Sequence, residues 1–561
     1  MKNHSAKSAP GAPRSSPKGR QPDAEAIAQV QLLLGESPRD ASLLIEFLHL
    51  IQDRYRQISA AHLVALAHEL KLSYAEVYEV ATFYHHFDVV KDEAAIAPEL
   101  TIRVCDGLSC EMAGAKTLFM ELQARYRFPI RVITAPCIGR CEAAPAVCAG
   151  QHAFGQASLA KVAAVLDARE VEAPLMQTVR RQGAYEMLQR CLSGRLQPEE
   201  AMATLEHAGL RGLGGAGFPA GRKWRIVAAE IGPRLMVVNI DEGEPGTFKD
   251  RWYLERNQHA FLEGMLIAAW AVDVSEIYIY LRDEYHAIRA LLTHEIAALP
   301  AQWAEGFAQL GREMPKIHLR RGAGAYICGE ESAMIESIEG KRGMPRLRPP
   351  YVAQVGLFGR PTLVHNMETL YWVPQILNQG AEAFTAHGRH GRAGLRSFSV
   401  SGRVSKPGVH LAPAGITLNE LITEYCGGML PGHVLYGYFP GGASGGILPA
   451  HLANIPLDFD TLQAYGCFIG SAAIVVLSQH DRARDAALNT LHFFQHESCG
   501  QCTPCRAGTE KAVHLLAEKV WNKALLDDLG QVMQDASICG LGQAAPNPFL
   551  SVLKYFPQEV E

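Results

Sequence analysis

The sequence predicts a multidomain chain of mixed α/β and α+β structure, and three observations support this. At roughly 150 residues per domain, 561 residues make about three to four domains. Apolar residues follow a helical spacing towards both ends, whereas short apolar strands alternate with helices and glycine-rich loops between them. The hydrophobic fraction of 48% and the charged fraction of 20% exclude a collagen, a coiled-coil rod and a largely disordered chain.

Charge and hydropathy exclude further classes. With 53 Lys and Arg against 58 Asp and Glu, the net charge of −5 gives no indication of binding to nucleic acid or to an anionic membrane. No apolar run approaches the length of a membrane helix, so we expect no membrane insertion. The N-terminus has no apolar signal region, which favours a cytoplasmic protein. Residues 1–24 are expected to be a disordered tail, although a transit peptide can have a similar composition.

The first two ordered segments differ in kind. Residues 25–97 form a helical lead, because apolar residues recur at helical spacing between positions 43 and 51, and Ser73 with Glu76 predicts a capping box. Residues 98–170 form a small α/β domain. Its expected elements are strands Leu100–Val104 and Ile130–Ala135, a short strand at 146–148, and helices at 111–126 and 157–168. Residues 171–198 carry little signal and are expected to be a linker.

Three further segments follow. Residues 199–392 alternate strands with helices and glycine-rich loops, which is typical of an open α/β domain. The predicted strands are Leu235–Asn239, Ile277–Leu281 and Lys316–Leu319. Residues 393–480 form a small mixed domain with several turns, and residues 481–561 are helical again, interrupted by a group of cysteines.

Thirteen cysteines are present, and eight of them fall into two tight groups. The odd number and the missing signal peptide argue against a disulfide framework. In the second group Cys499, Cys502 and Cys505 are each three residues apart, and Cys539 follows later. Three thiolates at this spacing can each bind one iron of a [4Fe–4S] cube, whereas zinc more often uses two separated pairs. The spacing predicts a [4Fe–4S] cluster, with zinc as the alternative.

The first group consists of Cys105 and Cys110, separated by four residues, and Cys137 and Cys141, separated by three. Each pair follows a predicted strand of the small α/β domain. An x4 pair suits a [2Fe–2S] cluster, and these spacings are less usual for zinc. A zinc site and a purely structural role remain the alternatives. The other five cysteines are expected to be small buried hydrophobic residues.

A glycine-rich loop opens the larger α/β domain. Gly212, Gly214 and Gly217 match the G-x-G-x-x-G pattern, but the pattern follows a helix instead of a strand, unlike a Rossmann loop. We interpret it as a phosphate-binding loop of another type, with Lys223 as a nearby cation. The alternative is a turn that is glycine-rich only because it is tightly packed.

An acidic turn ends the first strand of the same domain, with Asn239, Asp241, Glu242 and Glu244 close together. Carboxylates repel phosphate, so they are better suited to ribose hydroxyls, flavin ring N–H groups or a nicotinamide amide. A solvated acidic turn is the alternative. A second glycine-rich turn spans residues 321–332, and the segment around Asn366 begins another helix whose N–H groups could hold a phosphate. Together these segments suit a flavin plus a dinucleotide.

These motifs resemble the NADH-oxidising module of respiratory complex I, with its two NADH-oxidising subunits fused into one chain. The resemblance covers about residues 25–556. It rests on the two cysteine groups and on five segments: Ala81–Tyr84, Arg211–Trp224, Asn239–Arg251, Gly322–Ser332 and Glu497–Gly508. A finer resemblance is to the beta subunit of NAD-dependent molybdenum- or tungsten-containing formate dehydrogenase. Its segments are Arg211–Gly217, Val274–Glu284 and Ile538–Ala545. The diaphorase of NAD-reducing hydrogenase is the nearest rival.

The resemblance implies a fold for each part. It implies a thioredoxin-like [2Fe–2S] domain after the helical lead and an FMN- and NAD(H)-binding α/β domain. A ubiquitin-like β-grasp domain and a helical bundle with [4Fe–4S] are implied to follow. The cysteine ligands are Cys105, Cys110, Cys137 and Cys141 for [2Fe–2S], and Cys499, Cys502, Cys505 and Cys539 for [4Fe–4S].

The resemblance also implies the flavin and dinucleotide contacts. The implied FMN contacts are Gly212, Gly214, Lys223, Asn239, Asp241, Glu242, Gly329, Glu330, Asn366 and Thr369. The implied NAD(H) contacts are Phe218, Glu244, Glu331, Arg348 and Tyr351. His365 stands where complex I chains usually have Asn, so it is left out of the flavin set. No side chain is expected to act as a catalytic acid or base on the transferred hydride.

The implied function is that of the diaphorase subunit of a formate dehydrogenase. Formate would be oxidised on an alpha subunit that carries molybdopterin with Mo or W and iron–sulfur clusters, and NAD+ would be reduced here through [4Fe–4S] and FMN. A higher oligomer of such heterodimers is possible. The alternatives are the NADH-oxidising module of a hydrogenase or of a complex I-type NADH:quinone oxidoreductase, and a non-catalytic scaffold with zinc at both cysteine groups.

Overall fold

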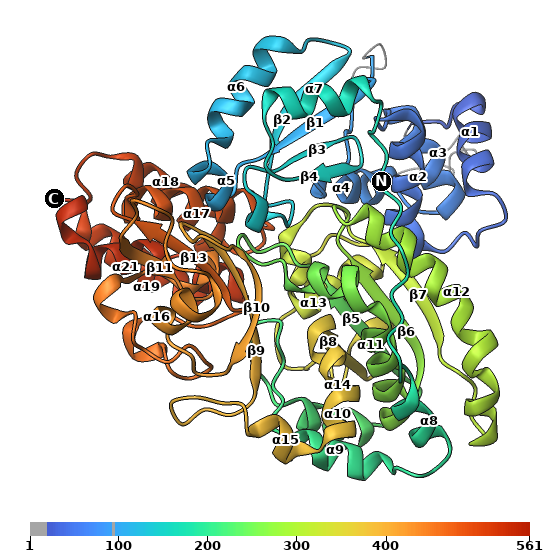
Figure 1. Cartoon of the computed structure of the whole chain (residues 1–561). Coiled ribbons are helices and arrows are strands. Elements are labelled where there is room, and N and C mark those ends of the chain that lie inside the picture. The colour runs from blue at the N-terminus through green and yellow to red at the C-terminus, as the bar shows by residue number, and fades with distance from the viewer. Residues whose placement is uncertain (1–19, 92–95) are drawn as a thin grey trace, which may run out of the picture.

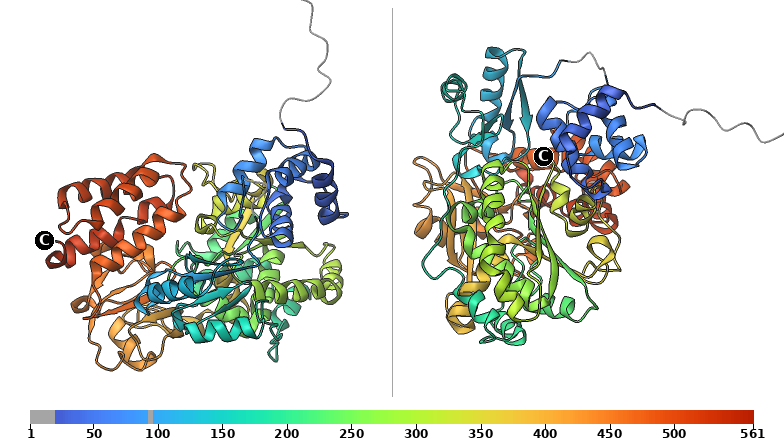
Figure 2. Two further views of the ribbon diagram at one scale, coloured as in Figure 1. Left: turned by 90° about the horizontal axis from the view of Figure 1, so that it is seen from above. Right: turned by 90° about the vertical axis from the view of Figure 1, so that its right-hand side faces the viewer.

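The computed structural model describes residues 20–91 and 96–561. The expected disordered tail therefore falls mostly on residues that lie outside this description. The chain forms a helical lead, two α/β domains, a β-sheet domain and a C-terminal helical bundle (Figure 1). The bundle projects from the side of the molecule away from the lead when the molecule is seen from above (Figure 2). No helix among the described residues combines the length and apolar character needed to cross a bilayer.

The helical lead contains α1 (Ala24–Leu34), α2 (Leu44–Tyr55), α3 (Ala60–Leu70) and α4 (Tyr74–Phe83). The predicted capping box of α4 is confirmed, since Ser73 accepts from the Glu76 N–H and Glu76 accepts from the Ser73 N–H. The lead also packs against the larger α/β domain. The Tyr84 hydroxyl at its end donates to the carbonyl of Lys341 at 2.7 Å, so the lead is part of the main body.

The thioredoxin-like domain is built on a four-stranded sheet in the order β2-β1-β3-β4. Its strands are β1 (Leu100–Cys105), β2 (Ile130–Ala135), β3 (Val147–Ala149) and β4 (His152–Phe154), with β1 and β2 parallel. Its helices are α5 (Leu108–Met112), α6 (Ala115–Arg125) and α7 (Leu159–Asp167). The single helix expected at 111–126 is two helices, because Gly114 adopts a left-handed conformation (φ 87°) between them.

The expected linker 171–198 contains a helix, α8 (Glu186–Leu192). Leu188 and Cys191 of α8 are fully buried in the core of the larger α/β domain. The backbone N–H groups of Met187 and Leu188 donate to the Glu263 carboxylate at 3.0 and 3.1 Å. Seven residues are too few to show a helical period in sequence, which explains why this helix was missed.

The larger α/β domain has an all-parallel sheet in the order β7-β6-β5-β8. The strands are β5 (Arg234–Ile240), β6 (Val274–Leu281), β7 (Lys316–Arg321) and β8 (Thr362–Asn366). The first three confirm predicted strands, and β8 was not predicted. The helices are α9 (Pro198–His207), α10 (Ala220–Ala228), α11 (Lys249–Val272), α12 (His286–Gln309), α13 (Glu331–Ile338), α14 (Met367–Gln379) and α15 (Ala381–Thr385).

Both faces of this sheet are covered, as an all-parallel sheet requires. Met236 and Val238 of β5 belong to the core that includes α8, α11 and α14. Leu235 and Val237 point the other way, into a core shared with the helical lead and α13. The carboxyl ends of the four strands therefore meet at one edge, where the acidic turn follows β5 and Asn366 ends β8.

The last two parts match the expected order. The β-grasp domain has a five-stranded mixed sheet in the order β10-β9-β13-β11-β12. Its elements are β9 (Leu395–Gly402), β10 (Gly408–Pro413), α16 (Leu418–Glu420), β11 (Leu435–Phe439), β12 (Leu448–Pro449) and β13 (Ala473–Ser478). The bundle consists of α17 (Ala483–Glu497), α18 (Thr503–Ala517), α19 (Lys523–Ala536), α20 (Gly540–Ala544) and α21 (Asn547–Tyr555).

Candidate flavin, dinucleotide and iron–sulfur sites

The first cysteine group converges at the end of the thioredoxin-like sheet. Cys105 is the last residue of β1, Cys110 lies in α5, and Cys137 and Cys141 follow β2. The sulfur atoms of Cys137 and Cys141 are 3.3 Å apart, and all four side chains are buried. Hydrogen bonds from Cys105 and Cys141, helped by the charge of Arg282, hold the pKa of Cys137 well below its usual value. Bonds to the neighbouring thiols hold the pKa values of Cys105 and Cys141 well above the usual value, so Cys137 is the thiol that releases its proton readily. Four adjacent buried thiols fit the four ligands of a [2Fe–2S] cluster.

The second cysteine group lies in the bundle. Cys499 lies in the loop after α17, Cys502 caps α18, Cys505 lies in its first turn, and Cys539 caps α20. Burial raises the pKa of Cys505 to about 11, and Cys502 and Cys499 add to the effect. Burial also raises the pKa of Cys539 to about 12, with a further contribution from Cys499. The structure thus brings the distant Cys539 to the other three, and the positive ends of two helix dipoles point at the group, which favours thiolates.

The glycine-rich loop 212–217 follows α9, as predicted from the sequence, and leads into α10. The Leu213 N–H donates to the Thr369 hydroxyl at 2.9 Å, which fixes the loop to α14. A Cβ on Gly214 would lie 3.0 Å from the Cβ of Asn366, so a larger residue would push the loop away from the end of β8. The loop is therefore held against the edge where the parallel strands end.

Lys223 brings a partly buried positive charge to the same place. Its Nζ donates to the carbonyl of Val364 at 3.1 Å, and no acidic group within the described residues pairs with it. Burial lowers the pKa of Lys223, although the negative charge of Glu331 acts in the opposite direction. A partly buried ammonium group that bonds one backbone carbonyl retains donors for an anion, and this fits a phosphate or a negatively charged flavin ring.

The four polar residues of the acidic turn differ in how their side chains are used. Asn239 donates to the carbonyl of Gly329 at 2.8 Å and accepts from the N–H of Asp241. Oδ2 of Asp241 is buried without a hydrogen-bond partner, and burial holds the pKa of this carboxyl well above its usual value. A buried carboxyl oxygen without a partner is costly unless a ligand satisfies it. Asp241 therefore fits a contact to a flavin hydroxyl or ring N–H.

Glu242 and Glu244 are already engaged within the chain. The Glu242 carboxylate accepts from the N–H of Asp250 and from the Tyr285 hydroxyl, both at 2.8 Å, and burial raises its pKa to about 7. Glu244 accepts from the N–H and the hydroxyl of Ser444, and burial raises its pKa. Glu242 therefore fixes the acidic turn to α11, and Glu244 connects the same turn to the β-grasp domain.

The second glycine-rich turn places two glutamates at the start of α13. Glu330 caps this helix by accepting from the N–H groups of Ser332 and Ala333. Glu331 forms an ion pair with Arg348 at 3.0 Å, and Arg348 also pairs with Glu330. The implied NAD(H) residues Glu331 and Arg348 are thus brought together beside the implied FMN residue Glu330.

Two aromatic rings of the implied dinucleotide set are accessible. Phe218 is 38% exposed and Tyr351 is 56% exposed, so both rings are accessible to a ligand. Nζ of Lys223 lies 6.0 Å from the centre of the Phe218 ring. An exposed ring beside a cation fits a stacking surface for a planar ligand.

Asn366 belongs to a buried network that the sequence did not predict. Its amide donates to Asp250 at 2.7 Å and accepts from Lys249 at 3.2 Å. Lys249 also forms ion pairs with Asp250 at 2.7 Å and Glu368 at 3.1 Å. Burial opposes the charge on Lys249, but the two acids outweigh it and raise its pKa. The network fixes the end of β8, so the amide of Asn366 is used mainly for positioning.

Three other residues were also missed by sequence reasoning. Tyr326 lies between the acidic turn and the second glycine-rich turn. A Cβ added to Gly243 would be 3.1 Å from the Tyr326 ring, so the ring packs closely against the acidic turn. The Tyr326 N–H donates to Glu497 at 2.8 Å. Arg251 donates to the carbonyl of Gly139 at 2.8 Å, and Arg282 to that of Cys137 at 2.6 Å. Arg282 directly follows β6, and a cation at the carboxyl end of a parallel strand was the available signal.

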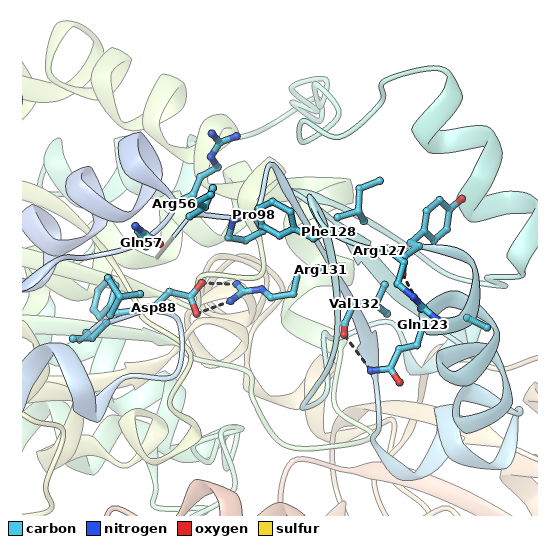
Figure 3. Close-up of a pocket in the computed structure, with 16 residues that line it drawn as sticks. Arg56, Gln57, Asp88, Pro98, Gln123, Arg127, Phe128, Arg131 and Val132 are labelled. Carbon is cyan, nitrogen blue, oxygen red and sulfur yellow. Dashed lines mark hydrogen bonds and ion pairs between the residues drawn. The ribbon is translucent and has the colours of Figure 1, made fainter. Parts of the chain in front are cut away.

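Several cavities lie between domains, and the two described here are not lined by the loop 212–217. One of about 850 Å³ separates the helical lead from β2, with the Asp88–Arg131 ion pair on its wall (Figure 3). None of the predicted site residues lines it. A second, of about 420 Å³, lies between the lead and both α/β domains, and its lining includes Asp241, Arg282 and Glu497.

Three family models match successive parts of the chain. Residues 30–170 match the thioredoxin-like [2Fe–2S] ferredoxin family, and residues 205–375 match the Nuo51 FMN-binding domain. Residues 485–561 match the NADH-ubiquinone oxidoreductase-F iron–sulfur binding region. These matches confirm FMN, [2Fe–2S] and [4Fe–4S] as the cofactors and argue against a zinc scaffold.

Curated relatives and solved structures extend the comparison. The chain is 41% identical to the F subunit of NADH-quinone oxidoreductase from Aquifex aeolicus over 387 residues, which cover 68% of this chain and 89% of the relative. It is 39% identical to the F 2 subunit of the same enzyme from Rhizobium meliloti over 402 residues, covering 70% and 95%. A chain of a NAD+-reducing [NiFe]-hydrogenase in the H2-reduced state superposes with a TM-score of 0.80 at 30% identity, covering 93% of both chains. The chain therefore belongs to the family of NADH-quinone oxidoreductase F subunits, with a thioredoxin-like [2Fe–2S] domain in front of the FMN-binding domain.

Proposed function

We propose that this chain is the diaphorase subunit of an NAD-dependent formate dehydrogenase. In this proposal a partner subunit oxidises formate at a Mo or W centre, and this chain uses the electrons to reduce NAD+ to NADH, reversibly. Bound FMN would exchange a hydride with NAD(H) and single electrons with the iron–sulfur clusters. The chain's own task is to bind, orient and connect these groups.

The observation that carries the redox part is the position of the acidic turn between both cysteine groups. On one side, Arg282 donates to the carbonyls of Glu242 and Cys137. On the other side, Tyr326 packs against Gly243 and donates its N–H to Glu497, two residues before Cys499. A flavin held at this turn would lie between the two metal sites, as transfer of single electrons over short distances requires.

Several residues have distinct roles in this proposal. Lys223 and the loop with Gly212 and Gly214 bind the negatively charged part of the flavin. The unpaired Oδ2 of Asp241 accepts a hydrogen bond from an O–H or N–H group of the flavin. Phe218 and Tyr351 hold the nicotinamide or adenine ring by stacking. Glu331, with Arg348, binds polar groups of NAD(H), and its charge disfavours the extra phosphate of NADP. The two cysteine groups ligate the two clusters.

The formate part rests on the sequence resemblance of Arg211–Gly217, Val274–Glu284 and Ile538–Ala545. A second candidate is the NADH-oxidising chain of a NAD+-reducing hydrogenase. It is favoured by the superposition, since that hydrogenase chain matches this one over 93% of its length, including the thioredoxin-like domain. The two candidates share the site and differ only in the partner that supplies electrons.

The deciding experiment is affinity purification of this chain from its native cells, with three assays on the purified complex. The proposal predicts NAD+ reduction driven by formate, together with a co-purified large subunit containing Mo or W. NAD+ reduction driven by H2 with a nickel-containing partner would support the second candidate instead. NADH–quinone activity without either would assign the chain to a complex I-type enzyme.

A further inference from the structure

Arg282 links the loop of the [2Fe–2S] cysteines to the acidic turn. It follows the last residue of β6, and its side chain is almost fully buried. One arm of the guanidinium donates to the carbonyl of Cys137 at 2.6 Å, and the other donates to the carbonyl of Glu242. The side chain also forms an ion pair with Glu284 at 3.0 Å. A rigid, permanently charged fork is therefore fixed between the two segments.

The surroundings hold the positive charge in place. Burial alone would lower the pKa of Arg282, but Glu284 and Tyr285 outweigh it and keep the pKa well above the usual value. Glu284 is half-buried, with 28% of its side chain exposed, so water partly screens its charge. The guanidinium of Arg282 contacts the Cys137 carbonyl directly, with no solvent between them. The positive charge of Arg282 therefore acts on the cysteine loop with less screening than the negative charge of Glu284.

A buried cluster is sensitive to such a charge. Reduction of a [2Fe–2S] centre adds one electron without a proton, which converts one ferric ion to ferrous and makes the centre more negative by one charge. Burial disfavours this added charge, and a nearby cation stabilises it. Hydrogen bonds and charges around the ligands are known means by which a protein sets a cluster potential.

We propose that Arg282 is a positioning residue that stabilises the reduced [2Fe–2S] centre and couples it to the acidic turn of the flavin site. The inference rests on the proposed assignment of Cys105, Cys110, Cys137 and Cys141 as cluster ligands. The coupling arises because one guanidinium bonds the carbonyls of Cys137 and Glu242. A shift of the acidic turn therefore moves the charge that acts on the cluster.

The test is a redox titration of the purified full chain, in which the electron paramagnetic resonance signal of the [2Fe–2S] centre is followed. Arg282→Gln removes the charge and retains a hydrogen-bond donor. We expect its equilibrium constant for reduction to fall at least tenfold, which corresponds to a potential lower by about 59 mV. Arg282→Lys retains the charge and should lower the constant to a smaller extent. The [4Fe–4S] potential, measured in the same samples, should not change.

Glu284→Gln makes the test independent of any folding defect in the Arg282 variants. It removes the negative partner of Arg282, so the [2Fe–2S] centre should become easier to reduce, a change of opposite sign. Arg225→Gln, which breaks two surface ion pairs between α10 and α9, is the matched control.

The possible results separate the inference from the cysteine assignment. A normal [2Fe–2S] signal whose potential is the same in Arg282→Gln and in the wild type would overturn the inference alone. Shifts of the same sign in Arg282→Gln and Glu284→Gln would also overturn it. A wild-type chain that contains iron and flavin but gives no [2Fe–2S] signal would overturn the cysteine assignment, and the inference with it.

Discussion

The backbone N–H of Tyr326 donates to Oε2 of Glu497 at 2.8 Å, which joins the second glycine-rich turn of the flavin domain to the last residue of α17. The Tyr326 ring also packs against Phe493 of the same helix, with ring centres 4.9 Å apart. The bundle that carries the second cysteine group is thus attached directly to the turn that leads to Gly329 and Glu330. The stability of this turn should depend on Glu497.

Glu497→Ala is expected to leave the Tyr326 N–H without a partner in a largely buried position. Such a loss costs about 1–3 kcal/mol, so the variant should unfold at a lower temperature and retain less flavin. Glu497→Gln keeps a carbonyl oxygen for the N–H and should behave nearly as the wild type. Thermal unfolding and the FMN content per chain measure both effects. Equal behaviour of Glu497→Ala and His492→Ala, which changes an exposed residue of the same helix, would contradict this role.

Lys223→Ala should weaken flavin retention and thereby impair NADH–ferricyanide activity. Loss of a charge-assisted hydrogen bond costs about 1.5–3 kcal/mol, or roughly a tenfold to hundredfold weaker binding of FMN. The flavin content after gel filtration and the dissociation constant for added FMN measure it. Arg222→Ala is a suitable control, since Arg222 is exposed, adjacent in sequence and near the same Phe218 ring. Normal flavin content and normal turnover in Lys223→Ala would refute the assignment.

Sequence patterns predicted the features that depend on residues close together in the chain. The Ser73–Glu76 capping box involves four consecutive residues, and the Cys499, Cys502 and Cys505 spacing reflects one loop. Strand β5 has a continuous apolar run, as expected for a strand buried on both faces. In each case the physical cause acts within a few residues, so the sequence is sufficient to reveal it.

Features that arise from tertiary contacts were not predictable in the same way. Helix α8 is stabilised by its burial and by Glu263, which lies more than seventy positions later in the chain. The resemblance implied a flavin contact for Glu242, but the bonds of its carboxylate to Asp250 and Tyr285 had no sequence signal. Tyr326 and Arg282 gain their importance only from Glu497 and Cys137, which lie far away in sequence. Such partners have no local pattern to indicate them.

Cys502→Ala is expected to abolish the [4Fe–4S] signal and leave the [2Fe–2S] signal intact. The reason is that the two cysteine groups lie in separate domains and pack into separate cores. Iron content and low-temperature electron paramagnetic resonance of the reduced chain would measure this. Cys426→Ala is the control, because Cys426 is fully buried in the β-grasp domain and belongs to neither group. A [4Fe–4S] signal that survives in Cys502→Ala would show that Cys502 is not a ligand.

Acid should destabilise the chain through His286, a buried residue at the start of α12. Burial lowers its pKa to about 4, so the folded state favours the neutral ring, whereas the unfolded chain binds a proton near pH 6.5. The contribution of the neutral His286 ring to the free energy of unfolding is fully present above about pH 6.5. This contribution is lost as pH falls towards 4, by about 1.4 kcal/mol per pH unit. His286→Gln should therefore lose less thermal stability between pH 7 and pH 5 than the wild type does. His294→Gln, an exposed change on the same helix, should show the wild-type pH dependence, and an equal pH dependence in all three proteins would disprove the role of His286.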